Sequence, residues 1–304
     1  GLRGPDSLRW GPDVAGAERG GMVSRGRCPS DILAARNPLM TLLLSLTSRS
    51  LQSLLDPSAD PPRTLFDAPS FVSGELGLRG LSLDVDMLAG WTSAEMDMLR
   101  HRSDQAGCPC LVLVDYTALE FGHEDESVRN AATQRLTRLA GAATRLGCNS
   151  VSVPLSIGRD DRPAVSRAIA AVQHSLLAIE RQELNLLLSG GLGLTDNSEG
   201  LSELIKEIGG FRIGALPTYG DPGSSEDPID HIKRLAPYAG AIHLRCEGFK
   251  RGGGHRGLDL AAAMAAAKAV GYQSNVAIDY VGEGDPATDI VKAMEILQAA
   301  IDAE

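Results

Sequence analysis

The sequence predicts a single-domain α/β protein of the (β/α)8 barrel type, and three observations lead to this prediction. Short runs rich in leucine and β-branched residues recur, successive runs begin about 28 to 40 residues apart, and helix-patterned stretches separate them. That spacing accommodates one strand, one crossover helix and two loops. Eight such units over about 240 residues fit a closed barrel better than an open doubly wound sheet. The predicted strands are residues 41–46, 80–85, 110–115, 150–154, 184–189, 212–217, 240–245 and 275–280.

The stretches between these runs carry helix signals. Thr92 and Glu95 form a capping-box pattern, which predicts a helix that packs Met96 and Leu99. Residues 126–146 place valine, leucine and alanine side chains on one face. Similar periodicity predicts helices within 165–179, 201–208 and 290–301. Glycines follow several of these helices, where a left-handed residue is favoured before the next strand.

The chain divides into two unequal parts. Residues 1–38 are rich in Gly, Arg and Pro and lack sustained periodicity, whereas residues 39–304 carry the barrel pattern. The first part is interpreted as a flexible arm, a cover over the barrel bottom, or sequence upstream of a start at Met22 or Met40. We assign it no chemistry.

Composition excludes several classes of function. The net charge is −10 and aromatic residues make up 4%, which argues against a nucleic-acid-binding surface. No stretch approaches the roughly 20 apolar residues of a membrane span. The five cysteines lack zinc-site spacing and are expected to be reduced core thiols. These features predict a cytoplasmic protein with no nucleic-acid or membrane partner. The sequence is compatible with a homo-oligomer.

Polar side chains follow the apolar strands, and in a barrel such positions lie at the mouth where chemistry takes place. Each is therefore a candidate for the functional site. They are Asp84 and Asp86, Asp115 and Tyr116, Ser189, Thr218 to Asp221, His243 and Arg245, and Asp279 to Asp285.

The sequence resembles the xylose isomerase-like barrels, also described as sugar phosphate isomerases/epimerases and related to AP endonuclease family 2. The similar passages are residues 75–83, residues 143–149 before the fourth strand, Ile242-His-Leu244, and residues 271–285. Together they extend over most of the chain. The resemblance implies a barrel enzyme that moves a proton next to a sugar carbonyl.

The resemblance also implies a divalent metal site at four strand ends. The matching positions here are Ser189, Thr218, His243 and Asp279. Ser189 and Thr218 are neutral hydroxyls where the family has carboxylates, and Asp279 is shorter than the family's Glu. A site of one imidazole and one carboxylate should hold Mg2+ or Mn2+ only weakly. The site could be rebuilt from Asp221, Glu247 or His255.

Two functions follow as alternatives. The first is an isomerase or epimerase acting on a small sugar or sugar acid. In it His243 and Asp279 are catalytic and hold any metal, and Arg245, Lys250, Asp115, Ser189 and Thr218 bind substrate. The second is a non-catalytic barrel that lost its metal site and serves as a binding or assembly subunit. Metal-dependent DNA repair is disfavoured by the acidic charge.

Overall fold

A computed structural model describes residues 42–55, 58, 63–157, 161–220 and 226–303. The arm predicted for residues 1–38 and the first residue of the first predicted strand, Thr41, lie outside the described residues. The domain boundary near residue 38 therefore stays a prediction.

Nine strands form one sheet, and every strand pair in it is parallel. Their order is β6-β5-β4-β3-β2-β1-β9-β8-β7. The first six strands are therefore neighbours in chain order, and the last three strands continue the sheet on the other side of β1, with β9 next to β1. The strands are β1 (Leu43–Thr47), β2 (Leu81–Asp84), β3 (Cys110–Val114), β4 (Ser150–Ser156), β5 (Asn185–Leu192), β6 (Ile213–Ala215), β7 (Thr218–Tyr219), β8 (Ala241–Cys246) and β9 (Asn275–Tyr280).

The sixth predicted strand is divided, which corrects the expected count of eight. Residues 212–217 contribute β6, which pairs with β5, and the chain resumes as β7, which pairs with β8. Pro217 lies between them and has no N–H to donate to a neighbouring strand. The backbone nitrogen of Leu216 donates to Leu188 O, whereas His243 N donates to Pro217 O. The sheet is curled, and β6 is joined to the segment that leads into β8 by one isolated parallel bridge, Ala215 to Ala239, beside which the Gly240 N–H donates to Ala215 O at 3.0 Å.

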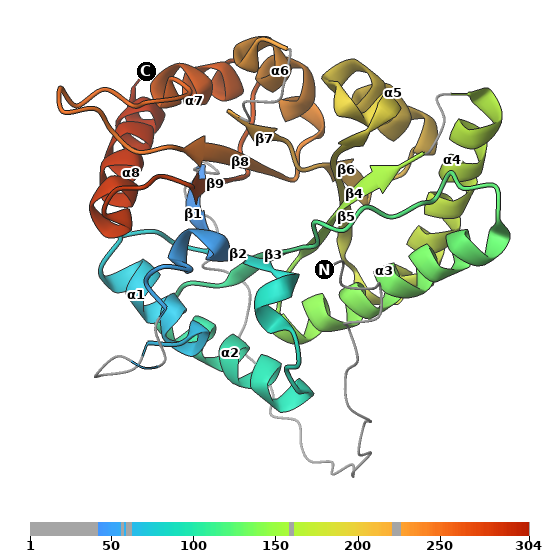
Figure 1. Ribbon diagram of the computed structural model, residues 1–304, viewed down its shortest axis with the longest axis horizontal. Helices are drawn as coiled ribbons and strands as arrows, with labels where there is room; N and C mark the ends of the chain where they lie inside the picture. The colour runs from blue at the N-terminus through green and yellow to red at the C-terminus, as the bar shows by residue number, and fades with distance from the viewer. Residues whose placement is uncertain (1–41, 56–57, 59–62, 158–160, 221–225, 304) are drawn as a thin grey trace, which may run out of the picture.

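Helices surround the curled sheet on its outer side, as Figure 1 shows. This arrangement explains why the strands are apolar on both faces. The helices are α1 (Ala68–Gly74), α2 (Ser93–Ala106), α3 (Glu126–Leu146), α4 (Arg162–Ala178), α5 (Ser198–Ile208), α6 (Pro228–Leu235), α7 (Leu260–Ala269) and α8 (Pro286–Asp302). Short 3-10 turns follow several strands directly, among them η1 (Ser48–Leu51) after β1 and η3 (Val85–Leu88) after β2.

Local signals in the sequence begin and end these helices as predicted. Thr92 caps α2, its side chain accepts from the Glu95 N–H, and Glu95 in turn accepts from the Thr92 N–H. Gly147 ends α3 in the left-handed conformation with φ of 77°. The predicted apolar face of α3 is confirmed, because Leu136, Leu139 and Leu146 are buried.

The core fills the space between sheet and helices and inside the sheet. The prediction of buried thiols is confirmed for Cys108, Cys110, Cys148 and Cys246, which are free and buried. Burial raises the pKa of all four, so they are poor nucleophiles. Cys28 lies outside the described residues. Among the described helices, none is long and apolar enough to cross a membrane.

Candidate functional site

Polar side chains from five neighbouring strands meet at the carboxyl end of the sheet. Arg49 follows β1, Asp84 ends β2, Tyr116 follows β3, and His243 and Asp279 belong to β8 and β9. Their charges act on one another: Asp279 and Asp84 both act on Arg49 and on Tyr116, and Asp279 and Arg49 act on His243. We call these five residues the mouth cluster. It lies where barrel enzymes carry their active sites.

The short turn η1 holds the mouth cluster together through three hydroxyl side chains. Thr47 Oγ1 donates to Asp279 Oδ1 at 2.7 Å. Ser48 Oγ accepts from the Asp84 N–H at 2.9 Å, and Ser50 Oγ accepts from the Tyr280 N–H at 2.7 Å. The turn is therefore bound to β2 on one side and to β9 on the other. Arg49 projects from the middle of this fixed segment.

Arg49 and Asp84 form the charged part of the cluster. The Arg49 Nε lies 3.6 Å from Asp84 Oδ2, and its guanidinium lies 4.4 Å from the centroid of the Tyr116 ring. Asp84 is 8% exposed. Burial raises the pKa of Asp84, and the nearby charges of Asp86 and Asp115 raise it further, while the Asp86 N–H and Arg49 oppose this. A carboxyl with a raised pKa is better suited to take up and return a proton.

Tyr116 keeps its proton at neutral pH. Burial raises the pKa of its phenol to about 12, although Arg49 lowers it in part. The cluster thus presents a guanidinium and a phenol O–H as donors next to carboxylates. Such donors can stabilise negative charge that develops on a substrate oxygen.

His243 and Asp279 lie deeper than the other members. His243 is 1% exposed, and its Nε2 is 3.3 Å from Ser82 Oγ inside the barrel. Burial lowers the pKa of His243, and Arg49 lowers it further against the opposing charge of Asp279, so the imidazole is neutral. Asp279 is 7% exposed and accepts from Thr47. The structure places the two predicted catalytic residues together, and their catalytic role stays a prediction.

A cavity of about 680 Å³ opens beside the mouth cluster. Its volume falls within the roughly 300–1,000 Å³ of ordinary ligand pockets. Described residues between β1 and α1 line it, as do residues from the end of β2 onward. Its lining includes Arg49, Asp84 and Tyr116 from the cluster, together with Gln52, Leu55, Arg63, Thr64, Leu65, Phe66, Asp86, Met87 and Trp91.

The other predicted site residues lie apart from this cluster. Ser189 ends up in β5 and Thr218 in β7, where it is in register with His243. Within the described ranges, no hydrogen bond joins either hydroxyl to the mouth cluster. Arg245 is in register with Asp279, and its Nε lies 3.5 Å from Glu247. Lys250 is exposed.

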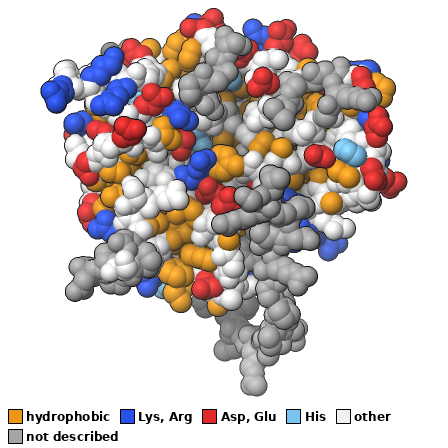
Figure 2. Space-filling view, in the orientation of Figure 1, with side chains coloured by type: hydrophobic (Ala, Val, Ile, Leu, Met, Phe, Trp, Pro, Cys, Tyr) orange, Lys and Arg blue, Asp and Glu red, His pale blue; other side chains and the backbone are white. Residues whose placement is uncertain are grey.

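Basic side chains gather near Lys250, over the loop between β8 and α7 at the upper left of Figure 2. Lys250 N donates to Gly254 O at 2.8 Å, which folds this loop into a tight turn. The loop presents its charges to solvent. The predicted substrate contacts of Arg245, Lys250, Ser189 and Thr218 stay untested.

Asp115 is engaged in a buried ion pair. Arg135 of α3 binds it with two contacts, Nε to Oδ2 at 2.6 Å and Nη2 to Oδ1 at 3.1 Å. The Thr117 N–H also donates to it. Asp115 is 1% exposed. Both carboxylate oxygens are therefore occupied within the protein, and the geometry gives this predicted substrate ligand a role in fastening α3 to β3.

The donors at the mouth do not fit a divalent metal ion. His243 Nε2 faces Ser82, Asp279 Oδ1 is bonded to Thr47, and a guanidinium lies among the carboxylates. Over the part of the chain that the structure describes, no group of three or more His, Cys, Asp or Glu could hold a metal. Mg2+ and Mn2+ require several oxygen ligands with free lone pairs.

The loop that could rebuild a metal site is also occupied. His255 Nε2 accepts from the Glu247 N–H at 3.1 Å, and Nδ1 lies 2.8 Å from Leu258 O. In the tautomer that carries the proton on Nδ1, both ring nitrogens form hydrogen bonds with backbone groups. Asp221 lies outside the described residues.

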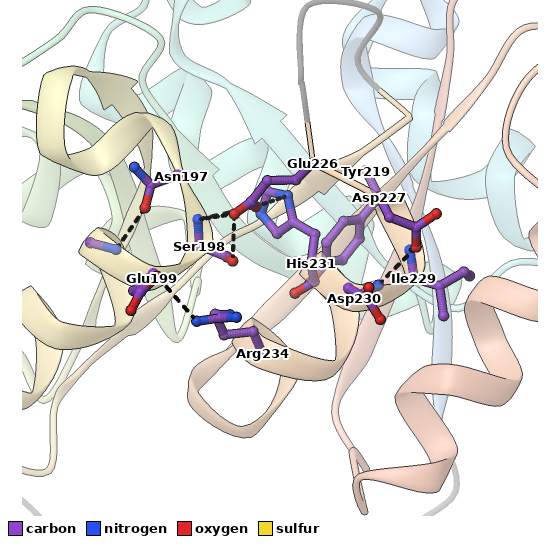
Figure 3. A network of polar contacts seen from close by, with 11 residues as sticks. Asn197, Ser198, Glu199, Tyr219, Glu226, Asp227, Ile229, Asp230, His231 and Arg234 are labelled. Atoms are coloured by element: carbon purple, nitrogen blue, oxygen red, sulfur yellow. Dashed lines mark hydrogen bonds and ion pairs between the residues drawn. The ribbon is translucent and has the colours of Figure 1, made fainter.

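A second polar network, shown in Figure 3, joins α5 to α6 away from these residues. Ser198 donates its N–H and its Oγ–H to Glu226, and Glu226 Oε2 lies 3.2 Å from His231 Nδ1. The carboxylate thus separates the hydroxyl from the imidazole, so His231 cannot take the Ser198 proton directly. This order does not make a nucleophilic triad. The network connects two helix starts.

Sequence reasoning missed Arg49, Arg63 and Trp91. A signal for Arg49 exists in the sequence, because Thr47-Ser-Arg-Ser50 is a polar run directly after an apolar strand. No sequence pattern near Arg63 or Trp91 predicts that either residue lines a cavity at the mouth. Arg63 and Trp91 therefore become visible only in the fold.

No family model matches the chain, and no curated protein sequence matches it. Solved structures match over most of the fold. L-ribulose 3-epimerase is 15% identical with a TM-score of 0.68, covering 85% of this chain and 95% of that one. D-psicose 3-epimerase from Clostridium cellulolyticum H10 is 14% identical with a TM-score of 0.64, covering 86% and 97%. The IolI protein with a zinc atom is 14% identical with a TM-score of 0.65, covering 86% and 98%.

These similarities define the class of the fold. The chain has a parallel, helix-covered, barrel-type fold, which it shares with these solved sugar epimerases. At identities of 14–15% the similarity shows the fold alone. The function must therefore be argued from the residues of the site.

Proposed function

We propose that the chain catalyses proton transfer at a carbon next to a carbonyl of a small sugar or sugar acid. This is the chemistry of an isomerase or epimerase. One observation carries the proposal: a buried carboxyl with a raised pKa, Asp84, lies beside the Arg49 guanidinium at the carboxyl end of the sheet and opens onto a cavity. The epimerase neighbours support the same class of reaction.

Asp84 removes the proton in this mechanism. The C–H electron pair moves into the bond to the carbonyl carbon, and the carbonyl π pair moves onto oxygen. Arg49 and the Tyr116 phenol donate hydrogen bonds to that oxygen as its negative charge grows. The intermediate is an enediolate or enolate.

The proton then returns to carbon. Return to the former carbonyl carbon gives isomerisation, and the hydroxyl proton on the neighbouring oxygen then moves to the former carbonyl oxygen. Return to the opposite face of the carbon that lost the proton gives epimerisation. Asp279, the other carboxylate whose charge acts on Arg49, is the second proton carrier. Neutral His243 supports Asp279 from below, in keeping with the catalytic roles expected for both.

Deuterium exchange tests this function without knowledge of the product. The protein is incubated in D2O with a panel of ketoses, aldoses and sugar acids, and 1H NMR follows loss of the signal next to the carbonyl. We expect exchange with at least one sugar, lowered by roughly 10²-fold or more in Asp84→Asn. Asp97→Asn, on the exposed face of α2, is the matched control and should exchange normally. Equal exchange by Asp84→Asn would disprove the role of Asp84.

A binding module is the second candidate. His243 and Asp279 both form hydrogen bonds within the barrel, and these bonds favour a structural role for the two residues over a catalytic one. In that case a sugar binds but no sugar in the panel exchanges its proton.

A further inference from the structure

The cavity beside the mouth cluster has an uneven distribution of charge. Its arginines, Arg49 and Arg63, come from the segment before α1, whereas its acids, Asp84 and Asp86, come from the segment after β2. Arg49 is paired with Asp84 at 3.6 Å, so a ligand in the cavity meets one guanidinium that is paired with a lining carboxylate and a second one, Arg63, whose acidic neighbour does not line the cavity. The two arginines differ in how far their charge is already compensated.

Arg49 is compensated by the carboxylates of the mouth cluster. Asp84 lies 3.6 Å from it, and the charge of Asp279 also acts on it. Arg63 differs. Among the described residues, its acidic neighbour within ion-pair distance is Glu75, at 4.0 Å, and the Glu75 side chain is 65% exposed. An exposed pair at that distance contributes little.

The Arg63 side chain is nevertheless held in place. Its guanidinium lies 4.4 Å from the centroid of the Phe71 ring, and Phe71 is buried in α1. A guanidinium that stacks on an aromatic ring keeps its N–H donors in one plane and can bind a carboxylate or phosphate with two of them. Arg63 is therefore an oriented cation with donors available at the cavity wall.

The same cavity has an aromatic wall. Phe66 and Trp91 are stacked with ring centroids 4.7 Å apart and an angle of 27° between their planes. Both rings line the cavity. They line the same cavity as Asp84 and Arg63 and offer an apolar surface against which the C–H face of a sugar can pack.

We propose that this cavity binds an acidic sugar, with its carboxylate or phosphate on Arg63 and its carbonyl end toward Asp84 and Arg49. This inference rests on the proposed function for the reacting end of the ligand. The anionic group itself is assigned by Arg63 alone. A carboxylate and a phosphate present similar oxygen acceptors to the N–H donors of a guanidinium, and the experiment separates the two groups.

Trp91 provides a reporter for this site. The chain has two tryptophans, Trp10 and Trp91, so a Trp10→Phe background leaves the cavity residue as the single fluorophore. Fluorescence titrations use D-glucose, D-glucuronate and D-glucose 6-phosphate, with inorganic phosphate as the ion alone. We expect one of the two acidic sugars to bind at least about 10-fold more tightly than glucose.

Three variants locate the effect. Arg63→Gln should remove the preference for the acidic sugar. Glu75→Gln should leave it nearly unchanged, because the exposed Arg63–Glu75 pair contributes little. Arg102→Gln is the matched control, because Arg102 lies 5.5 Å from the Phe66 ring but does not line the cavity; it should keep the preference. Circular dichroism confirms that each variant is folded.

Several results would overturn the proposal. They are equal affinity for glucose and both acidic sugars, an unchanged preference in Arg63→Gln, or no saturable Trp91 signal with any of the probes. Failure of the two proposals can be told apart. Acidic sugars that bind through Arg63 without deuterium exchange disprove only the enzymatic function. Exchange that is as fast with neutral sugars and insensitive to Arg63→Gln disproves only the acidic-sugar site.

Discussion

Asp84 illustrates at the level of one residue how a site can cost stability. The pKa of its carboxyl is raised in the folded protein by burial. For an acid this means that its favourable contribution is complete below the unfolded pKa of about 3.9 and is lost as the pH rises through the folded pKa. Above the folded pKa, the charged form is present at the expense of stability.

The first prediction follows from this sign. Asp84→Asn removes the charge and can still accept from the Asp86 N–H, the bond that Asp84 Oδ1 makes at 2.9 Å. We expect the free energy of unfolding at pH 7 to rise by about 1 kcal/mol, as in other cases where a strained site is relaxed. Urea denaturation at pH 7 measures this. A loss of stability in the variant would show that the Arg49 contact outweighs the burial of the charge.

His243 leads to a prediction with the opposite pH dependence. Burial lowers the pKa of its imidazole, so between the folded pKa and the unfolded value near 6.5 the unfolded chain binds a proton that the folded one does not. Stability should be complete above pH 6.5 and fall as the solution is acidified below it. The slope from this group is at most about 1.4 kcal/mol per pH unit.

Other groups also titrate in that range, so a comparison is needed. Urea unfolding of the wild type and of His243→Gln between pH 7.5 and 4.5 isolates the contribution. The variant should show a shallower decline. Parallel curves for the two proteins would mean that His243 is protonated in the fold.

The mouth residues show which parts of a site a sequence can reveal. His243 and Asp279 were predictable because each stands within or at the end of an apolar strand run and must reach the barrel interior or mouth. Asp84 was visible as a strand end, but nothing local distinguished it from Asp86. The position of Arg63 at the cavity depends on long-range packing, and no local sequence pattern predicts it.

At the level of elements, the fastening of α3 to β3 depends on one ion pair. Asp115 is 1% exposed and Arg135 11% exposed, with a shortest contact of 2.6 Å. Arg135→Met leaves a buried carboxylate without its partner, and we expect it to lower the free energy of unfolding by about 3–5 kcal/mol. The double variant Asp115→Leu with Arg135→Met should recover most of that loss. If Arg135→Met alone lowered the stability only slightly, the ion pair would not be needed for the fold, and Asp115 would again be a candidate substrate ligand.

Two glycines give a matched test of how elements pack. A Cβ on Gly122, in the loop after β3, would lie 2.3 Å from the Ile157 carbonyl oxygen at the end of β4. A Cβ on Gly141, on the exposed face of α3, would meet no atom within 4 Å. Gly122→Ala should therefore destabilise by about 1–3 kcal/mol. Gly141→Ala should stabilise by about 0.5–1 kcal/mol through helix propensity. Thermal unfolding distinguishes the two, and the same sign for both would contradict this packing.

The eightfold pattern was sufficient to predict the strands and helices, because each strand run is apolar and each helix has one apolar face. The division of the sixth strand was not predicted. Pro217 is the reason, since a residue without an N–H interrupts the ladder, and its effect depends on which neighbours β6 and β7 face.

For the whole molecule, the open question is whether a metal ion contributes to the fold. The structural similarity to a zinc-containing protein is clear at a TM-score of 0.65, yet the donors at the mouth of this chain are already bonded and accompanied by Arg49. A guanidinium near the carboxylates supplies positive charge without an ion and also repels one. The fold can therefore be shared while the source of charge differs.

Thermal unfolding with added ions tests this directly. An ion that binds the folded state at 100 times its Kd stabilises it by about 2.7 kcal/mol, and each kcal/mol raises the Tm of a barrel of this size by roughly 2–4 °C. With 2 mM MnCl2 or MgCl2 we expect a shift below about 1 °C, because Ser189 and Thr218 supply no anionic ligand. EDTA should likewise leave both the Tm and the deuterium exchange unchanged. A rise of several degrees that disappears in His243→Ala would instead establish a metal site, and the role given to Arg49 would then pass to the ion.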